Sequence, residues 1–118
     1  MTKNKTDKFD ITYLKSISNN DKTFIKEVLR LYVETSQIAV TKLESDLEKG
    51  DFKSIEFLLH RMRSSIMPFS LTNLNEQLKK TEQDISENNF SNVPKEIKLI
   101  IGQVKKSILS SEIELQKL

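Results

Sequence analysis

The sequence lacks cysteine and contains only two glycines and two prolines among its 118 residues. Without cysteine, neither a disulfide framework nor a thiolate metal site is possible. Glycine and proline interrupt helices, so their scarcity permits long unbroken segments. No apolar run approaches the roughly 18–20 residues that span a bilayer. The N-terminus is polar and lacks the apolar centre of a signal peptide, so we expect a cytoplasmic protein without membrane insertion.

A large excess of charge of one sign is also missing. Nineteen basic and seventeen acidic residues leave a net charge of +2. The sequence has no long basic run, so nothing in its charge pattern indicates a nucleic-acid partner. Hydrophobic residues make up 36% of the chain and charged residues 31%, which is ordinary for a folded protein. The length is that of one domain with a single core.

Apolar residues recur at the 3.6-residue spacing of amphipathic helices, and no segment alternates as a strand would. Asp10, Asp21 and Asp51 are suited to cap helices, and Gly50 supplies a left-handed residue after the second one. The pattern predicts five helical segments, at 10–18, 21–49, 51–67, 71–86 and 93–116.

These segments predict an all-α protein, an antiparallel up-down-up-down four-helix bundle with a short N-terminal capping helix. We expect the bundle to occupy residues 9–118 and a disordered lead or linker to occupy residues 1–8. Phe24, Leu31 and Ile38 form a second apolar stripe on the longest helix, which is typical of a helix that touches more than one neighbour. Close helix contact is one reason for Gly102 to interrupt the last helix.

The third helix carries the one histidine of the chain, His60. At about 100° per residue, His60 lies about 160° from Met62, the centre of the apolar face. That face also contains Ile55, Leu58, Leu59 and Ile66. His60 is therefore expected to face solvent, and the predicted outer face around it also holds Lys53, Glu56, Phe57, Ser64 and Met67, with Arg63 at its edge. Two of these, Phe57 and Met67, are large apolar groups where water is expected.

An exposed imidazole is a competent nucleophile toward an already activated electrophile. Its neutral ring nitrogen can accept a phosphoryl group, whose oxygens Arg63 could neutralise and Ser64 could hydrogen bond. No glycine-rich nucleotide loop, acidic magnesium cluster or catalytic triad pattern is evident in the sequence. If His60 acts in phosphoryl transfer, a partner must supply the metal and most of the catalytic groups.

The run from Leu58 to Ser65, LLHRMRSS, resembles the signature of histidine-containing phosphotransfer (HPt) domains, in which lysine and then glycine follow the histidine at the positions of Arg63 and Ser64. The start of the long helix at 20–25, the acidic, glycine-ended turn at 43–52 and the stretch at 69–78 agree with that family in register. The resemblance covers residues 9–115.

The resemblance implies that His60 takes a phosphoryl group from a receiver-domain aspartate and passes it to another receiver, without kinase activity of its own. It implies receiver domains of response regulators as partners, with a hybrid sensor histidine kinase as a further one, and a monomeric carrier. No cofactor is expected, apart from magnesium on the partner receiver. The expected partner-binding residues are Lys53, Glu56, Phe57, Arg61 and Met67.

Two alternatives stay open from the sequence. The first is a non-catalytic HPt-like module that binds a receiver or kinase without phosphotransfer, and Ser64 in place of the family's glycine favours it. The second is an unrelated structural bundle, against which the retained His60 and its apolar surroundings argue.

Overall fold

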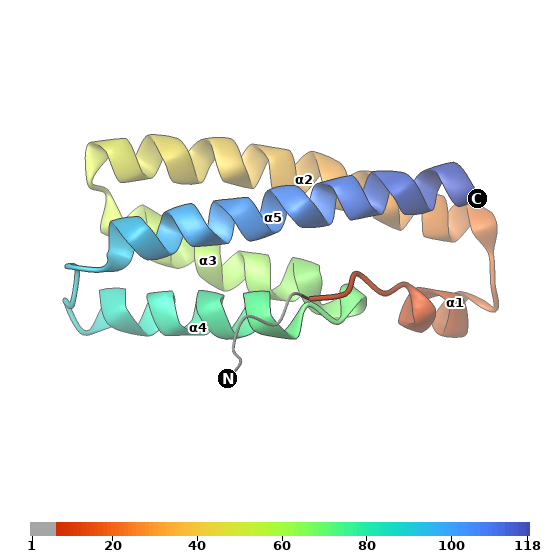
Figure 1. The fold of residues 1–118 in the computed structure, drawn as a ribbon, viewed down its shortest axis with the longest axis horizontal. Helices are drawn as coiled ribbons and strands as arrows, with labels where there is room; N and C mark the ends of the chain where they lie inside the picture. Colours follow the sequence, from red (N-terminus) through yellow and green to blue (C-terminus); the bar gives the residue numbers. More distant parts are fainter. Residues whose placement is uncertain (1–6) are drawn as a thin grey trace.

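The computed structural model describes residues 7–118, and helices are the only regular secondary structure in this range. The elements are α1 (Thr12–Ser18), α2 (Lys22–Lys49), α3 (Phe52–Ile66), the 3-10 turn η1 (Met67–Phe69), α4 (Thr72–Ser86) and α5 (Val93–Lys117). The four long helices run antiparallel, and α1 lies at one end of the bundle (Figure 1). The predicted all-α bundle is confirmed, with helix limits within two residues of those expected from periodicity.

Helices α2 and α3 each begin after an aspartate whose side chain caps them, and α2 ends at a residue whose backbone suits that position. The Asp21 carboxylate accepts hydrogen bonds from the backbone N–H groups of Thr23 and Phe24, and Asp51 accepts one from Ser54. Gly50 ends α2 with a φ of 69°, a conformation that residues with a Cβ rarely adopt. Both ends of the α2–α3 connection are therefore determined by local chemistry.

The α3–α4 connection depends on contacts from a distant part of the chain. Pro68 ends α3, and the 3-10 turn that contains it carries Phe69 into the core, where Phe69 is 1% exposed. The Phe69 ring stacks on Phe9 with centroids 4.6 Å apart and lies 4.8 Å from Tyr32. The N-terminal segment thus covers the end of the bundle at which α3 turns into α4.

The N-terminus of α4 is capped by Asp7 and not by a residue of its own turn. The Asp7 carboxylate accepts hydrogen bonds of 2.8 Å from the backbone N–H groups of Asn73 and Leu74. The sequence predicted a disordered lead or linker at residues 1–8, of which residues 1–6 lie outside the described residues. Asp7 departs from that expectation, because its carboxylate satisfies two N–H groups that the first turn of a helix leaves unpaired.

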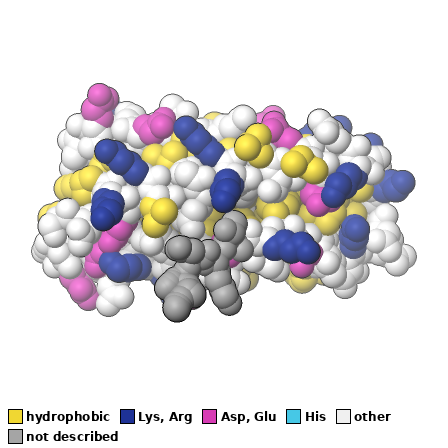
Figure 2. Space-filling view, viewed as in Figure 1, with side chains coloured by type: hydrophobic (Ala, Val, Ile, Leu, Met, Phe, Trp, Pro, Cys, Tyr) yellow, Lys and Arg dark blue, Asp and Glu magenta, His cyan; other side chains and the backbone are white. Residues whose placement is uncertain are grey.

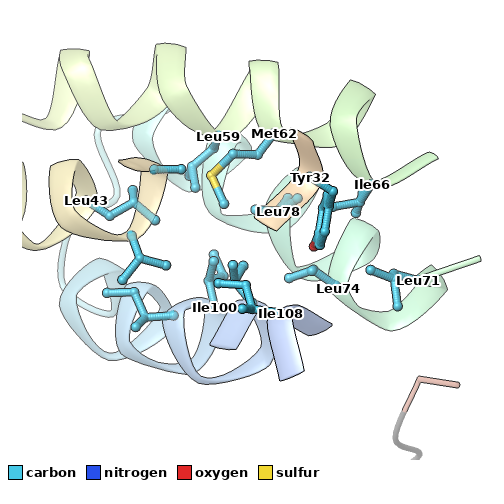
Figure 3. Packing of buried hydrophobic residues seen from close by; sticks show 14 of the residues in the cluster. Tyr32, Leu43, Leu59, Met62, Ile66, Leu71, Leu74, Leu78, Ile100 and Ile108 are labelled. Atoms are coloured by element: carbon cyan, nitrogen blue, oxygen red, sulfur yellow. The ribbon is translucent and has the colours of Figure 1, made fainter. Parts of the chain in front are cut away.

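The core is the common interior of the four long helices. Leu43 from α2, Leu59 from α3, Leu78 from α4 and Ile100 from α5 are each fully buried, and their side chains converge there in Figure 3. Helix α3 packs against α2 and α4, and α5 packs against the same two helices, whereas no Cα atom of α3 lies within 8 Å of a Cα atom of α5. These two helices are therefore diagonal in the bundle, with outer faces that point in different directions. Within residues 7–118 no helix is long and apolar enough to cross a membrane.

The expected close contact at Gly102 is wrong. Gly102 is exposed, and a Cβ built there would have no atom within 4 Å in the described chain beyond its chain neighbours and the backbone of its own helical turns. Because α5 is held by its opposite face, glycine at this position only adds backbone freedom to the unfolded chain.

Gly102→Ala is therefore expected to raise the free energy of unfolding by about 0.5–1 kcal/mol, measured by urea denaturation followed by circular dichroism. Gly50→Ala is the matched control and should lower it, because its φ of 69° strains an alanine. A loss of stability in the Gly102 variant would mean that the position makes a contact within the folded protein.

Candidate functional site

His60 lies in the middle of α3, and 72% of its side chain is exposed. The opposite face of the helix is buried through Ile55, Leu59, Met62 and Ile66. The assignment of His60 to the solvent face is confirmed, because it followed from the 3.6-residue repeat of these apolar positions.

The other residues expected at the site share this outer face. Lys53, Phe57, Arg61, Ser64 and Met67 are exposed, and Glu56 and Arg63 are half-buried. Phe57 and Met67 are 65% and 75% exposed, so neither belongs to the core. The Arg61 guanidinium lies 5.7 Å from the centre of the Phe57 ring, a cation–π distance. The structure thus gathers all eight residues around one face of α3.

Glu82, on α4, is the site residue that the sequence did not indicate. Its Oε1 atom lies 3.2 Å from Nδ1 of His60, and its Oε2 atom lies 3.2 Å from Nη1 of Arg63. The Glu82 side chain is only 15% exposed. One carboxylate therefore holds both the imidazole and the guanidinium. The contact could have been predicted from the position of the turn, because two antiparallel helices joined near residue 70 bring positions 60 and 82 side by side.

Arg63 lies at the edge of this face, as expected, but has a partner that the sequence did not indicate. Its guanidinium is paired with Glu82, and its side chain is 34% exposed. Arg63 Nε is buried and has no hydrogen-bond partner in the described part of the chain. The Glu82 carboxylate therefore neutralises part of the Arg63 charge, because Glu82 lies on the side of α3 that faces α4.

On the other side of His60, an apolar groove of about 590 Å³ lies between α2 and α3. Tyr32, Met62 and Val104 contribute to its lining from the bundle interior, and Leu31, Ile38 and Phe57 contribute from its exposed edges. Leu31 and Ile38 belong to the second apolar stripe of α2, which was expected to touch another helix. That expectation is wrong: Leu31 is 59% exposed and Ile38 67%, because they border the groove and no further helix of the described chain covers them.

Comparisons with known proteins support the resemblance at the level of fold. The sequence matches no family model and no curated protein. The crystal structure of histidine-containing phosphotransfer protein B (HptB) from Pseudomonas aeruginosa PAO1 is similar, with a TM-score of 0.82 and 16% sequence identity. The alignment covers 93% of this chain and 96% of HptB. This chain has the HPt fold.

In this HPt-like bundle, the Glu82 contact distinguishes the two ring nitrogens of His60. A carboxylate oxygen accepts hydrogen bonds, so the neutral imidazole places its proton on Nδ1, where it donates to Glu82. The lone pair is then on Nε2, which is the ring nitrogen free to act as a nucleophile. Glu82 also restricts rotation of the ring, as a carboxylate does for a catalytic histidine in other proteins.

Because the chain contains one histidine, its tautomer can be measured by nitrogen-15 NMR without resonance assignment. We expect the Nδ1–H tautomer to predominate in the native protein when the ring is neutral. Glu82→Ala should shift the proton toward Nε2, since the acceptor is removed. Glu76→Ala, an exposed glutamate on the same helix, is the control and should leave the two signals unchanged. Identical spectra for all three proteins would contradict the assignment.

Proposed function

We propose that this chain is a phosphorelay carrier in which His60 accepts a phosphoryl group from a receiver-domain aspartate and passes it to a second receiver. The observation that carries the proposal is an exposed imidazole, held through Nδ1 by Glu82, on a bundle with the HPt fold. The name of HptB describes a histidine-containing phosphotransfer protein, and the same role for this chain is part of the proposal.

The proposed step is a reversible displacement at phosphorus. The Nε2 lone pair of His60 attacks the aspartyl phosphate, an N–P bond forms, and the P–O bond to the aspartate breaks, releasing the carboxylate. The phosphorylated ring keeps its Nδ1 proton and becomes cationic. Glu82, 3.2 Å from Nδ1, stabilises that charge as it develops. Transfer to the second receiver runs through the same atoms in reverse.

In this proposal the remaining catalytic groups belong to the receiver. The electrophile arrives activated as an acyl phosphate, so no general base is needed on the carrier. A magnesium ion bound by the receiver would neutralise the phosphoryl oxygens. On the carrier, Lys53 and Arg61 add exposed positive charge to the helix that carries His60, which complements an acidic receiver site. Arg63 reaches the same face but shares its charge with Glu82.

Recognition is assigned to the exposed apolar residues beside the histidine. Phe57 and Met67 are large, exposed and on the same face as His60, with Glu56 at its half-buried margin. Phe57 also borders the groove between α2 and α3, so a receiver that covers His60 would bury it. Exposed aromatic and apolar groups that become buried on binding are the usual anchors of protein interfaces.

A second candidate function is a non-catalytic HPt-like module that binds a receiver or kinase without transfer. Two observations favour it over an ordinary carrier. Ser64 is exposed one turn after His60, where the resemblance places a glycine. Arg63, at the family's lysine position, is paired with Glu82 and thereby has less charge available for a phosphoryl group.

Phosphotransfer separates the two candidates. Receiver domains from the same genome, phosphorylated with radiolabelled acetyl phosphate, should transfer label to the native chain and not to His60→Gln. The label should be lost in acid and survive alkali, as a phosphoramidate does. Helical content should be the same in both proteins, because the His60 side chain is exposed. Receiver binding without labelling would favour the non-catalytic module, and labelling of the variant would place the acceptor elsewhere.

Phe57→Ala tests the docking surface. It should weaken receiver binding by about 1–3 kcal/mol, measured by calorimetry, and change the free energy of unfolding by less than about 1 kcal/mol, because Phe57 is largely exposed. Leu99→Ala is the control: Leu99 is 54% exposed and lies on α5, diagonal to α3. Equal weakening by both substitutions, or a loss of stability typical of a core aromatic, would rule out Phe57 as an anchor.

Ser64→Gly tests the approach to His60. Ser64 borders both the histidine face and the groove, so removing its side chain should make room for the receiver and speed transfer about two- to tenfold. The helix should lose about 1 kcal/mol of stability. Ser65→Gly carries a similar helix cost at the next position and is the control. A slower Ser64→Gly variant with intact helicity would mean that the hydroxyl binds the phosphoryl group.

A further inference from the structure

The outer face of α5 combines exposed lysines with exposed aliphatic side chains. Leu99, Leu109 and Ile113 are 54%, 62% and 53% exposed, although each is large enough to be a core residue. At about 100° per residue these three positions lie within an arc of about 80°. The same helix buries its opposite face in the core, so this exposed row is additional to the one that holds the bundle together.

The charge on this face is entirely positive. An arc of about 160°, centred on the three aliphatic residues, contains no acidic residue. Its remaining exposed members are Lys95, Lys98, Gly102, Lys105, Lys106, Gln116 and Lys117. Lys117 pairs with Glu114, whereas Lys95, Lys98, Lys105 and Lys106 have no acidic partner within the described chain. A net charge of +2 for the whole protein therefore conceals a strongly basic helix face.

This face lies away from His60. Figure 2 shows the side of the molecule along which α5 runs, where Lys, Arg and apolar side chains are interleaved, with Asp and Glu side chains also in view, and no histidine is visible there. Helix α3 lies behind α5 in the same orientation (Figure 1), and no Cα atom of one lies within 8 Å of a Cα atom of the other. A partner on the outer face of α5 would leave the His60 face open.

We propose that the outer face of α5 binds the surface of an anionic lipid bilayer, with the helix lying parallel to the membrane and not crossing it. Lysines on a preformed helix attract an anionic leaflet, with roughly a fivefold gain in partitioning for each one near the surface. Leu99, Leu109 and Ile113 would enter the headgroup boundary between them. The face spans about 33 Å from Lys95 to Lys117, at a rise of about 1.5 Å per residue.

A bilayer fits these residues better than another polyanion does. A nucleic acid or an acidic protein segment would use the lysines, but a polyanion backbone offers nothing to three exposed aliphatic side chains. A membrane interface uses both classes at once, since the alkyl stems of the lysines extend their charged groups past the buried aliphatic groups. The exposed aliphatic residues are therefore the feature that favours a bilayer over a soluble polyanion.

The test is sedimentation of the full chain with phosphatidylcholine vesicles that contain about a quarter of phosphatidylglycerol. The native protein should bind these vesicles, bind less as salt increases, and not bind pure phosphatidylcholine. The triple variant Lys98→Gln, Lys105→Gln, Lys106→Gln should lose at least tenfold in partitioning. Removing the same number of charges elsewhere, through Lys15→Gln, Lys49→Gln and Lys79→Gln, should change it less than about threefold. Circular dichroism checks that all variants keep the native helicity.

The contribution of the aliphatic residues is tested at unchanged charge. Leu99→Gln with Ile113→Gln should reduce vesicle binding severalfold, whereas Tyr13→Gln with Ile17→Gln, at positions of nearly the same exposure, should not. His60→Gln should bind as the native chain does, so this proposal can fail or hold independently of phosphotransfer. No binding of the native chain to anionic vesicles, or equal losses in the α5 and control variants, would overturn it. Binding that depends on the lysines alone and is stronger to heparin than to vesicles would replace the membrane with a soluble polyanion.

Discussion

Burial of Phe69 is the packing contact that positions α3 and α4 relative to each other. Phe69 follows Pro68 in the turn between these helices and is enclosed by Phe9 and Tyr32. From His60 the chain rises about 9 Å to the end of α3 and about 6 Å through the 3-10 turn. From the start of α4 to Glu82 it rises about 15 Å. The two distances agree, which is why the Glu82 carboxylate reaches the imidazole.

The site has two sides with different physical properties, because α3 has a different neighbour on each. Toward α4, Glu82 joins His60 and Arg63 in a polar cluster that orients the ring and can stabilise charge. Toward α2, the helices leave an apolar groove bordered by Phe57 and Leu31. The polar contacts of His60 and the apolar groove thus lie on opposite edges of one helix. A substitution on either edge can change one of them with little effect on the other.

A four-helix bundle also separates its diagonal helices by the full width of the core. Here α3 carries the candidate acceptor and α5 carries the basic, aliphatic face, and the backbones of the two helices are not adjacent. A protein partner at His60 and a membrane at α5 would therefore not compete for space. The conformational cost of either interaction is low, because both faces belong to helices that the core already orders.

The sequence by itself determined the helices and the direction in which His60 points. The spacing of residues such as Ile55, Leu59 and Met62 reports which face of a helix is buried, and Asp21, Gly50 and Asp51 mark helix ends through local hydrogen bonds or backbone conformation. These features depend on residues within one or two turns of each other, so periodicity and capping rules were sufficient.

Only the tertiary structure decided what lies beside His60. The Glu82 contact, the Asp7 cap of α4 and the exposure of Leu31 and Gly102 all depend on how helices far apart in the sequence are placed. A helical repeat shows that a residue points away from its own core face but not which neighbour, if any, stands opposite. That outcome depends on helix register and on the turn at Phe69, which balance many weak contacts across the whole bundle.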